Sequence, residues 1–240
     1  MDELIVRLVE FEKEIEYRTP QTPGQPDFRY APGSIRVLIS APHGAAHTRN
    51  GQIKAEDEYT AGMARLIAEL TGAHVIYAWR LSDSDPNFNF HAPYKLALKE
   101  IVQVNRIKFV IDLHGCSPER AFGIALGSMR GQSCPMELPN ILKALEANGY
   151  SPSGRGLYHV DVDHTFSGSG GDHHQTITRY AYEVLGVHSL QIELNAHVYV
   201  PHRMPDATQK QPFHGNPELI MRTIEALTAI VRSVDQNKNQ

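Results

Sequence analysis

The sequence has few cysteines, no long basic run and no long apolar run, and each shortage excludes a class of protein. Its two cysteines, Cys116 and Cys134, form no CxxC pair and no disulfide framework, which favours a reducing cytoplasm. No apolar run approaches the roughly 20 residues that cross a bilayer, so we expect no membrane partner. With 23 Lys and Arg against 27 Asp and Glu, and no basic cluster, we expect no nucleic-acid partner either.

The bulk composition is that of an ordinary globular protein. The chain has 240 residues, of which 41% are hydrophobic and 21% charged, enough for a single domain with one buried core. Its first residues, Met-Asp-Glu-Leu, are acidic and lack the basic region of a signal peptide, which again favours a cytoplasmic protein. Histidine is the unusual residue, at 13 copies, several of them beside glycines and acids.

Short apolar runs alternate with segments of helical periodicity along most of the chain. The runs predict strands at 34–41, 74–79, 107–113, 120–127 and 188–194. The periodic segments predict helices at 57–71, 93–104, 138–147, 176–185 and 217–234. This alternation is typical of an α/β fold in which neighbouring strands are parallel.

Both ends of the chain are less regular. Residues 1–18 match a helical stripe at Leu4, Leu8, Phe11 and Ile15 but also suit strands, so both remain open. Residues 19–32 contain four prolines and predict a loop that wraps the surface, which makes 1–33 an N-terminal extension of the domain. We expect a frayed tail over residues 235–240.

Polar side chains lie at the ends of three of the predicted strands. Packing of the apolar core does not explain polar residues at these positions. The motifs are Pro-His43-Gly, Asp112-Leu-His114-Gly and Gln-Ile-Glu193. In open α/β sheets the carboxyl ends of the strands meet at one edge, where ligands bind. Two histidines and one carboxylate, with a fourth position open, make a catalytic zinc site. A further carboxylate outside the ligand set would act as the general base towards the water that zinc activates.

The residues fit this division of roles. His43 and His114 would be the nitrogen ligands, an acid among residues 56–58 the oxygen ligand, and Glu193 the base. Asp112 would orient His114. Simpler alternatives remain open: His114 as a hydrogen-bonded core histidine, the acids at 56–58 as caps of the following helix, and Glu193 as a buried structural carboxylate.

Other hydrolytic chemistries find less support. The chain has no Gly-x-Ser-x-Gly elbow and no His-Glu-x-x-His motif. Cys116 follows His114 closely, so a thiol nucleophile is conceivable, but a small buried side chain is the commoner role for cysteine.

The motifs together resemble the N-formylglutamate amidohydrolase family, whose fold is similar to that of the zinc carboxypeptidases. Over residues 35–203 the matching pieces, in order, are Ser-Ala-Pro-His43-Gly, Lys54-Ala-Glu-Asp57-Glu-Tyr-Thr60, Asp85-Pro-Asn87, Asp112-Leu-His114-Gly, Gln175-Thr-Ile-Thr-Arg179-Tyr and Gln191-Ile-Glu193-Leu-Asn195. The resemblance implies a single α/β domain with a mixed, mostly parallel central sheet flanked by helices, zinc-carboxypeptidase-like. It places the metal carboxylate on Asp57, with Glu56 as the alternative. The chain departs from the family after Asn195, where an arginine usually follows sooner than Arg203 does.

The resemblance implies a hydrolase that uses Zn²⁺, or another divalent transition metal, to cleave the C–N amide bond of an N-acyl (N-formyl) amino acid or small peptide. Arg179, Arg49 and Arg203 are candidates to hold a substrate carboxylate, because arginine pairs with it through two parallel hydrogen bonds. Each of them could instead be a solvated surface charge. Alternatives for the whole chain are a peptidase or poly-glutamate hydrolase on the same site, and a non-catalytic metal-binding module.

Overall fold

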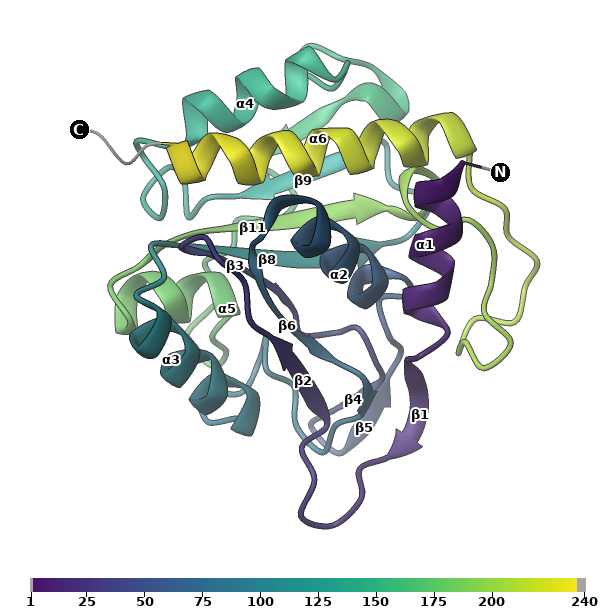
Figure 1. Ribbon diagram of the computed structural model, residues 1–240, viewed down its shortest axis with the longest axis vertical. Coiled ribbons are helices and arrows are strands. Elements are labelled where there is room, and N and C mark those ends of the chain that lie inside the picture. Colours follow the sequence, from purple (N-terminus) through teal and green to yellow (C-terminus); the bar gives the residue numbers. More distant parts are fainter. Residues whose placement is uncertain (1, 237–240) are drawn as a thin grey trace.

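The apolar runs of the sequence form the central strands of a seven-stranded sheet (Figure 1). The structure, a computed structural model, describes residues 2–236. The strands lie in the order β10 (Val160–Val162), β9 (Ile124–Gly127), β11 (His188–Asn195), β8 (Phe109–Cys116), β3 (Val37–Ala41), β6 (His74–Ala78) and β2 (Phe28–Ala31). Strands β11, β8, β3 and β6 are mutually parallel, whereas β2 and β9 run antiparallel to their neighbours β6 and β11. The predicted mixed, mostly parallel sheet is therefore confirmed.

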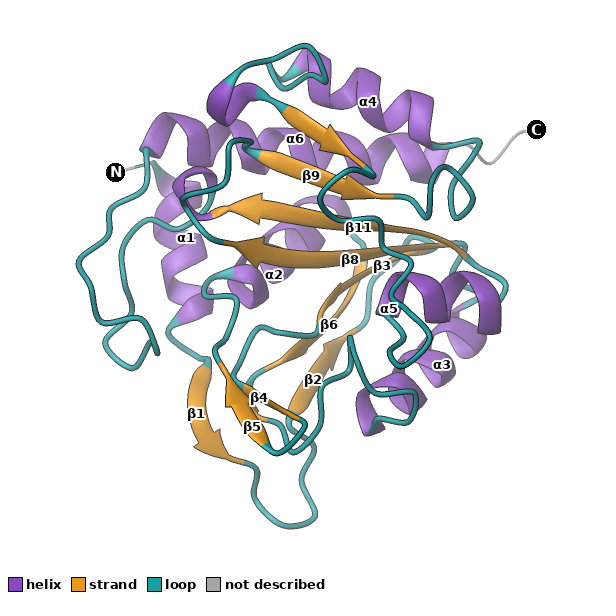
Figure 2. Ribbon diagram, turned by 180° about the vertical axis from the view of Figure 1, so that it is seen from behind, coloured by secondary structure: helices purple, strands orange, loops and turns teal. Residues whose placement is uncertain are grey.

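Helices cover both faces of this sheet. One face carries α1 (Glu3–Glu12), α2 (Thr60–Thr71), α4 (Leu138–Ala147) and α6 (Pro217–Gln236), and the view from behind in Figure 2 shows α3 (Pro93–Asn105) and α5 (Ile177–Arg179) on the other. A π-helical turn, Tyr180–Val184, continues α5. Among residues 2–236, no helix is both long enough and apolar enough to cross a membrane.

Along the central strands, successive side chains point to opposite faces of the sheet, so the apolar core and the polar residues lie on different faces. In β8, Ile111 and Leu113 enter the larger apolar core, under α2 and α6. Because successive side chains of a strand point to opposite faces, Asp112 and His114 lie on the face that α3 and α5 cover. Glu193 of β11 is paired in register with His114 and shares that face. The polar residues of both strands thus meet at their carboxyl ends.

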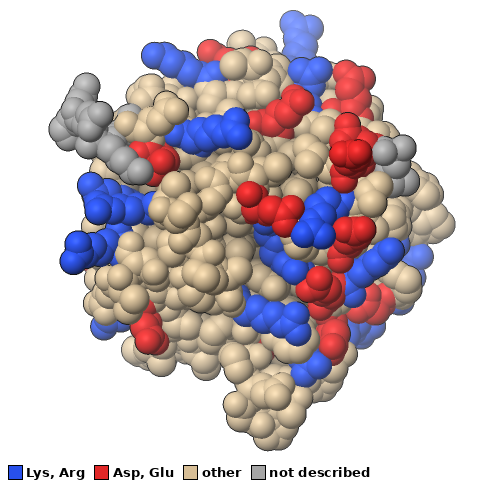
Figure 3. Space-filling model, viewed as in Figure 1, with Lys and Arg blue, Asp and Glu red and all other residues tan. Residues whose placement is uncertain are grey.

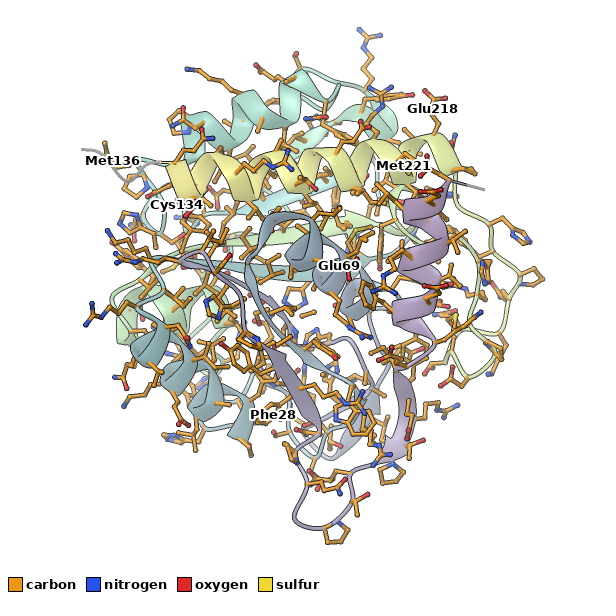
Figure 4. All side chains as sticks on the ribbon, in the orientation of Figure 1. Phe28, Glu69, Cys134, Met136, Glu218 and Met221 are labelled. Atoms are coloured by element: carbon orange, nitrogen blue, oxygen red, sulfur yellow. The ribbon has the colours of Figure 1, made fainter. Side chains whose placement is uncertain are left out.

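The N-terminal segment is a helix followed by a strand. Helix α1 packs on α2, where Arg7 pairs with Glu69 at 2.8 Å, and Figure 4 labels Glu69 on α2 beside α1. Strand β1 (Glu16–Pro20) then pairs with β7 (Arg80–Leu81). The carboxylate of Glu12, fully buried, accepts the backbone N–H groups of Tyr59 and Gly62 at 2.7 Å each and so caps α2.

Five short strands, namely β2, β4 (His47–Arg49), β5 (Gln52–Lys54), β7 and β10, and the end of one helix differ from the predictions. The predicted loop 19–32 contains β2, which tolerates nearby prolines because it is an edge strand. Residues 47–54, for which no strand was predicted, contain the hairpin of β4 and β5, and the unpredicted β10 pairs with β9. Helix α6 reaches Gln236, so the expected fraying is wrong at residues 235–236, and residues 237–240 lie outside the described part of the chain.

The surface shows no large area of one charge on the side seen in Figure 3. Basic and acidic side chains are interspersed there over α1, α2 and α6. Both cysteines are free, as their positions in the sequence predicted.

Candidate metal centre

Three side chains from separate parts of the chain converge beside the carboxyl ends of β3 and β8. His43 follows β3, Asp57 precedes α2, and His114 lies in β8. Asp57 Oδ2 lies 3.4 Å from His43 Nδ1 and 3.0 Å from His114 Nδ1. The structure thus brings together the histidines and the acid that the sequence motifs singled out.

The second nitrogen of each histidine is bound to another carboxylate. His43 Nε2 donates to Asp85 Oδ1 at 2.9 Å, and His114 Nε2 donates to Asp112 Oδ1 at 3.0 Å. Asp112 is held in turn by Thr178 of α5, whose backbone N–H and hydroxyl both donate to Oδ2 at 3.2 Å. In a neutral imidazole whose Nε2 carries the proton, the Nδ1 lone pair is free to bind a cation. Carboxylates in this position orient metal-binding histidines in known sites.

The donor atoms have the spacing that a divalent metal requires. Tetrahedral zinc with bonds of 2.0–2.1 Å places its ligand atoms about 3.3 Å apart. The two separations from Asp57 Oδ2, 3.0 and 3.4 Å, agree with that value. Burial alone would raise the pKa of Asp57, but the two imidazoles beside it outweigh burial and lower that pKa. The residues present therefore fit a bound metal ion.

Of the three neighbouring acids, Asp57 is the one that local hydrogen bonds hold beside the two histidines. Its N–H donates to His43 O at 2.8 Å, and its carbonyl accepts the Thr60 hydroxyl at 2.7 Å. The carboxylate of Glu56 accepts hydrogen bonds from Thr208. The carboxylate of Glu58 accepts hydrogen bonds from Arg203 and from the N–H of Met204. None of the three acids caps α2, because Tyr59 is its first flanking residue and the cap comes from Glu12.

A second group of possible ligands shares His43 with the first. His47 stacks on His43 with ring centroids 4.0 Å apart, and its Nε2 lies 3.4 Å from Asp85 Oδ2. Asp85 already accepts Arg49 Nε at 2.5 Å and the N–H of Asn87 at 2.8 Å, so it has little room for a cation. The sequence did not predict that His47 and Asp85 lie beside His43, although the Asp85-Pro-Asn87 motif marked the segment.

The first group opens into a cavity of about 570 Å³ that also contains Glu193. Glu193 is 6% exposed, and Gln191 Nε2 donates to its Oε1 at 2.7 Å. Burial raises the pKa of Glu193 to about 7. Cys116 lines the same cavity, but burial raises the pKa of its thiol, so it stays protonated and is a poor nucleophile.

Only one of the predicted substrate arginines lines this cavity. That residue is Arg49, which is paired with Asp85. Arg179 instead bonds Glu183 and the carbonyl of Gly171, and Arg203 pairs with Glu58 beside a neighbouring cavity.

A fourth arginine, Arg120, lies in the wall of the 570 Å³ cavity and went unnoticed in the sequence. It is exposed and stands 5.5 Å from the centre of the Phe166 ring. Within residues 2–236 no carboxylate forms an ion pair with it, so its charge is available to a ligand. No motif marked it, because it falls at the start of a predicted strand.

Residues 86–200 match the family model of N-formylglutamate amidohydrolases. The predicted resemblance is confirmed. The matched stretch includes His114 and Glu193 and leaves out His43 and Asp57. None of the curated proteins compared matches the chain.

Solved structures agree in fold at low sequence identity. The N-formylglutamate amidohydrolase of Ralstonia eutropha superposes with a TM-score of 0.57 at 16% identity, over 88% of this chain and 98% of that one. A bacteriophage poly-γ-glutamate hydrolase gives 0.52 at 12% identity, over 90% and 92% of the two chains. A Shewanella denitrificans protein described as a carboxypeptidase A gives 0.52 at 11% identity, over 98% and 69%. The fold is thus carboxypeptidase-like, and with the family match it supports a hydrolase of the amidohydrolase type.

Proposed function

We propose that the protein is a zinc-dependent hydrolase of the C–N amide bond in N-acyl amino acids or small peptides. His43, Asp57 and His114 would hold the metal, Glu193 would be the general base, and Arg120 would bind the substrate carboxylate. The observation that carries the proposal is the convergence of both Nδ1 atoms on Asp57 inside the cavity that contains Glu193. A cytoplasmic location is part of the same proposal, from the sequence alone.

The side chains of the cavity divide the reaction between them. When bound, zinc would polarise the amide carbonyl and lower the pKa of water. Glu193 accepts the proton of the attacking water and delivers it to the leaving nitrogen, which departs as an amine. Asp85 and Asp112 keep the two imidazoles in the orientation and tautomer that the site needs. A non-catalytic metal-binding module would have no use for a buried carboxylate such as Glu193, which forms no ion pair among the described residues.

Arg120 has the features of a carboxylate anchor. Arginine binds a carboxylate through two charge-assisted hydrogen bonds, and this arginine has no acidic partner of its own among the described residues. Arg49 remains a second candidate in the same cavity, but its attachment to Asp85 leaves less of its charge for a substrate.

The direct test is hydrolysis by purified, zinc-loaded protein of a panel of N-formyl, N-acetyl and aminoacyl amino acids, followed by release of the free amine. We expect turnover of at least one series, and a matched Glu193→Gln preparation without activity excludes a contaminating hydrolase. A folded, zinc-loaded protein that cleaves no member of the panel would refute the proposal.

Asp57→Ala is expected to weaken zinc binding at least about 100-fold, since it removes one of three protein ligands. Glu56→Ala and Glu58→Ala are the matched controls, and they should keep zinc and lose stability, because their carboxylates hold the segment 203–208. Elemental analysis and a chelator competition on the three variants measure both effects. Loss of zinc from Glu56→Ala in place of Asp57→Ala would assign the ligand to Glu56.

Amidation of the substrate carboxylate is expected to lower kcat/KM more than about tenfold, the scale of one charged hydrogen bond. Arg120→Ala should cause a similar loss on the free acid and little further loss on the amide. Arg155→Ala, at another exposed arginine, is the control for a general charge effect. Equal turnover of the acid and the amide would argue against a carboxylate anchor.

A further inference from the structure

A second cavity of about 340 Å³ adjoins the one that contains the metal ligands. The two cavities share Asp57, Gly115, Cys116 and Ser117 in their walls. Asp57 therefore stands between them, and Glu193 lines only the first. If Glu193 protonates the leaving nitrogen, the leaving amino acid occupies the first cavity, and the acyl group extends past Asp57 into the second.

The wall of the second cavity includes a tyrosine whose hydroxyl forms no hydrogen bond with the described residues. Tyr199 is 2% exposed and lines this cavity, and its hydroxyl has no hydrogen-bond partner within residues 2–236. Burial raises the pKa of Tyr199 well above its usual value, so the hydroxyl stays protonated. It packs directly against Gly115, where a Cβ atom would overlap it. The hydroxyl is therefore available to donate a hydrogen bond to a polar group of a ligand.

Acidic side chains predominate among the charged residues that line the second cavity. Glu56, Glu58 and Glu119 line it, and its one lining basic residue among those described, Arg203, is neutralised by Glu58. Glu119 is exposed and forms no ion pair within residues 2–236. The next residue, Arg120, lines the first cavity. Two consecutive residues thus present a free carboxylate to one cavity and a free guanidinium to the other.

The second cavity is larger than the space that a formyl group fills. Pockets that bind small ligands have volumes of roughly 300–1,000 Å³, so about 340 Å³ can hold an amino-acid-sized group, whereas a formyl group adds a single carbon.

We propose that the second cavity is the acyl subsite and that it takes an acyl group with a positively charged amine, as in a dipeptide with a free N-terminus. Glu119 pairs with the ammonium, and the Tyr199 hydroxyl donates to a carbonyl or other acceptor of the acyl group. This inference rests on the proposed function and narrows its substrate class from N-acyl amino acids in general to aminoacyl amino acids.

The first test compares two acyl groups of equal size on one leaving amino acid. A glycyl group carries an ammonium where a propionyl group carries a methyl. We expect kcat/KM to be more than about tenfold higher for the glycyl compound, and Glu119→Gln to remove most of that preference. Glu146→Gln, at an exposed acid of α4, should leave the preference intact. Equal rates for the two compounds, or a preference that survives Glu119→Gln, would overturn the inference.

The second test needs neither metal nor turnover. In an NMR titration, glycinamide should shift the amide signals of residues 115–119 and bind more than about tenfold tighter than propionamide, its uncharged isostere. Glu119→Gln should abolish that difference, and Tyr199→Phe should weaken both amides equally. No binding of glycinamide, or equal binding of the two amides, would refute the subsite.

The two proposals fail in different ways. Hydrolysis of N-formyl amino acids without that of glycyl compounds, together with absent glycinamide binding, would remove the subsite and leave the amidohydrolase. Selective glycinamide binding by a protein that cleaves no amide would retain the subsite and remove the reaction.

Discussion

Glu193→Gln is expected to lower kcat by about 10²- to 10⁴-fold, the usual contribution of a general base. The substitution keeps the shape of the side chain and removes its ability to accept a proton. Glu193 lies in β11 directly beside His114, and only Gln191 hydrogen-bonds its carboxylate among the described residues. Since no Lys or Arg among the described residues pairs with it, we expect its replacement to leave the fold and zinc binding unchanged.

A second buried carboxylate provides the control. Burial raises the pKa of Glu12 to about 7, as it does for Glu193, but Glu12 lies under α2 and outside the cavity. Glu12→Gln should therefore lower the melting temperature and keep kcat per zinc-loaded molecule. Zinc content, melting temperature and kcat from the same preparations distinguish the outcomes. Near-normal kcat with zinc bound would remove Glu193 from the mechanism, and loss of zinc would make it a ligand.

Removal of the metal is expected to abolish turnover and to lower the melting temperature by about 8–16 °C. A ligand at 1,000 times its Kd stabilises the native state by about 4 kcal/mol, and each kcal/mol shifts the melting temperature of a domain of this size by roughly 2–4 °C.

Thermal melts with and without a chelator measure the shift, and added zinc should restore both stability and activity. Asp57→Ala is the matched control, because a protein that already lacks a ligand should melt at nearly the same temperature with or without the chelator. A wild-type protein whose melting temperature and activity are both insensitive to chelation would exclude a structural or catalytic metal.

The central strands and the meeting of the polar residues at their carboxyl ends were predictable because both depend on short-range patterns. A strand buried on both faces reads as a continuous apolar run, and a histidine or acid directly after such a run lies at the sheet edge where parallel strands end. His43, His114 and Glu193 follow from this argument alone. The prediction of Asp57 also depended on the family resemblance, because the sequence has three consecutive acids and no local feature distinguishes them.

The remaining parts of the site depend on contacts between distant segments. Glu12 caps α2 from 47 residues away, and Thr178 holds Asp112 across 66 residues. Arg120 and Glu119 are exposed loop residues whose importance comes from the cavities they border, which exist only in the folded chain. Strand β2 was not predicted, because the prolines around it indicated a loop and the hydrophobic pattern of an edge strand is weaker than that of a buried strand.

The pairing of β3 with β8 has to precede assembly of the candidate metal site when the protein folds. His43 and His114 come within reach of one metal ion only after these two strands have paired, since 71 positions separate them in the chain, and Asp57 adds a third independent segment. An unfolded chain therefore offers no assembled site, and for the proposed metal we expect binding after the rate-limiting step of folding. Interactions formed after the transition state slow unfolding and leave refolding unchanged. Zinc should accordingly prolong the lifetime of the native protein without hastening its formation.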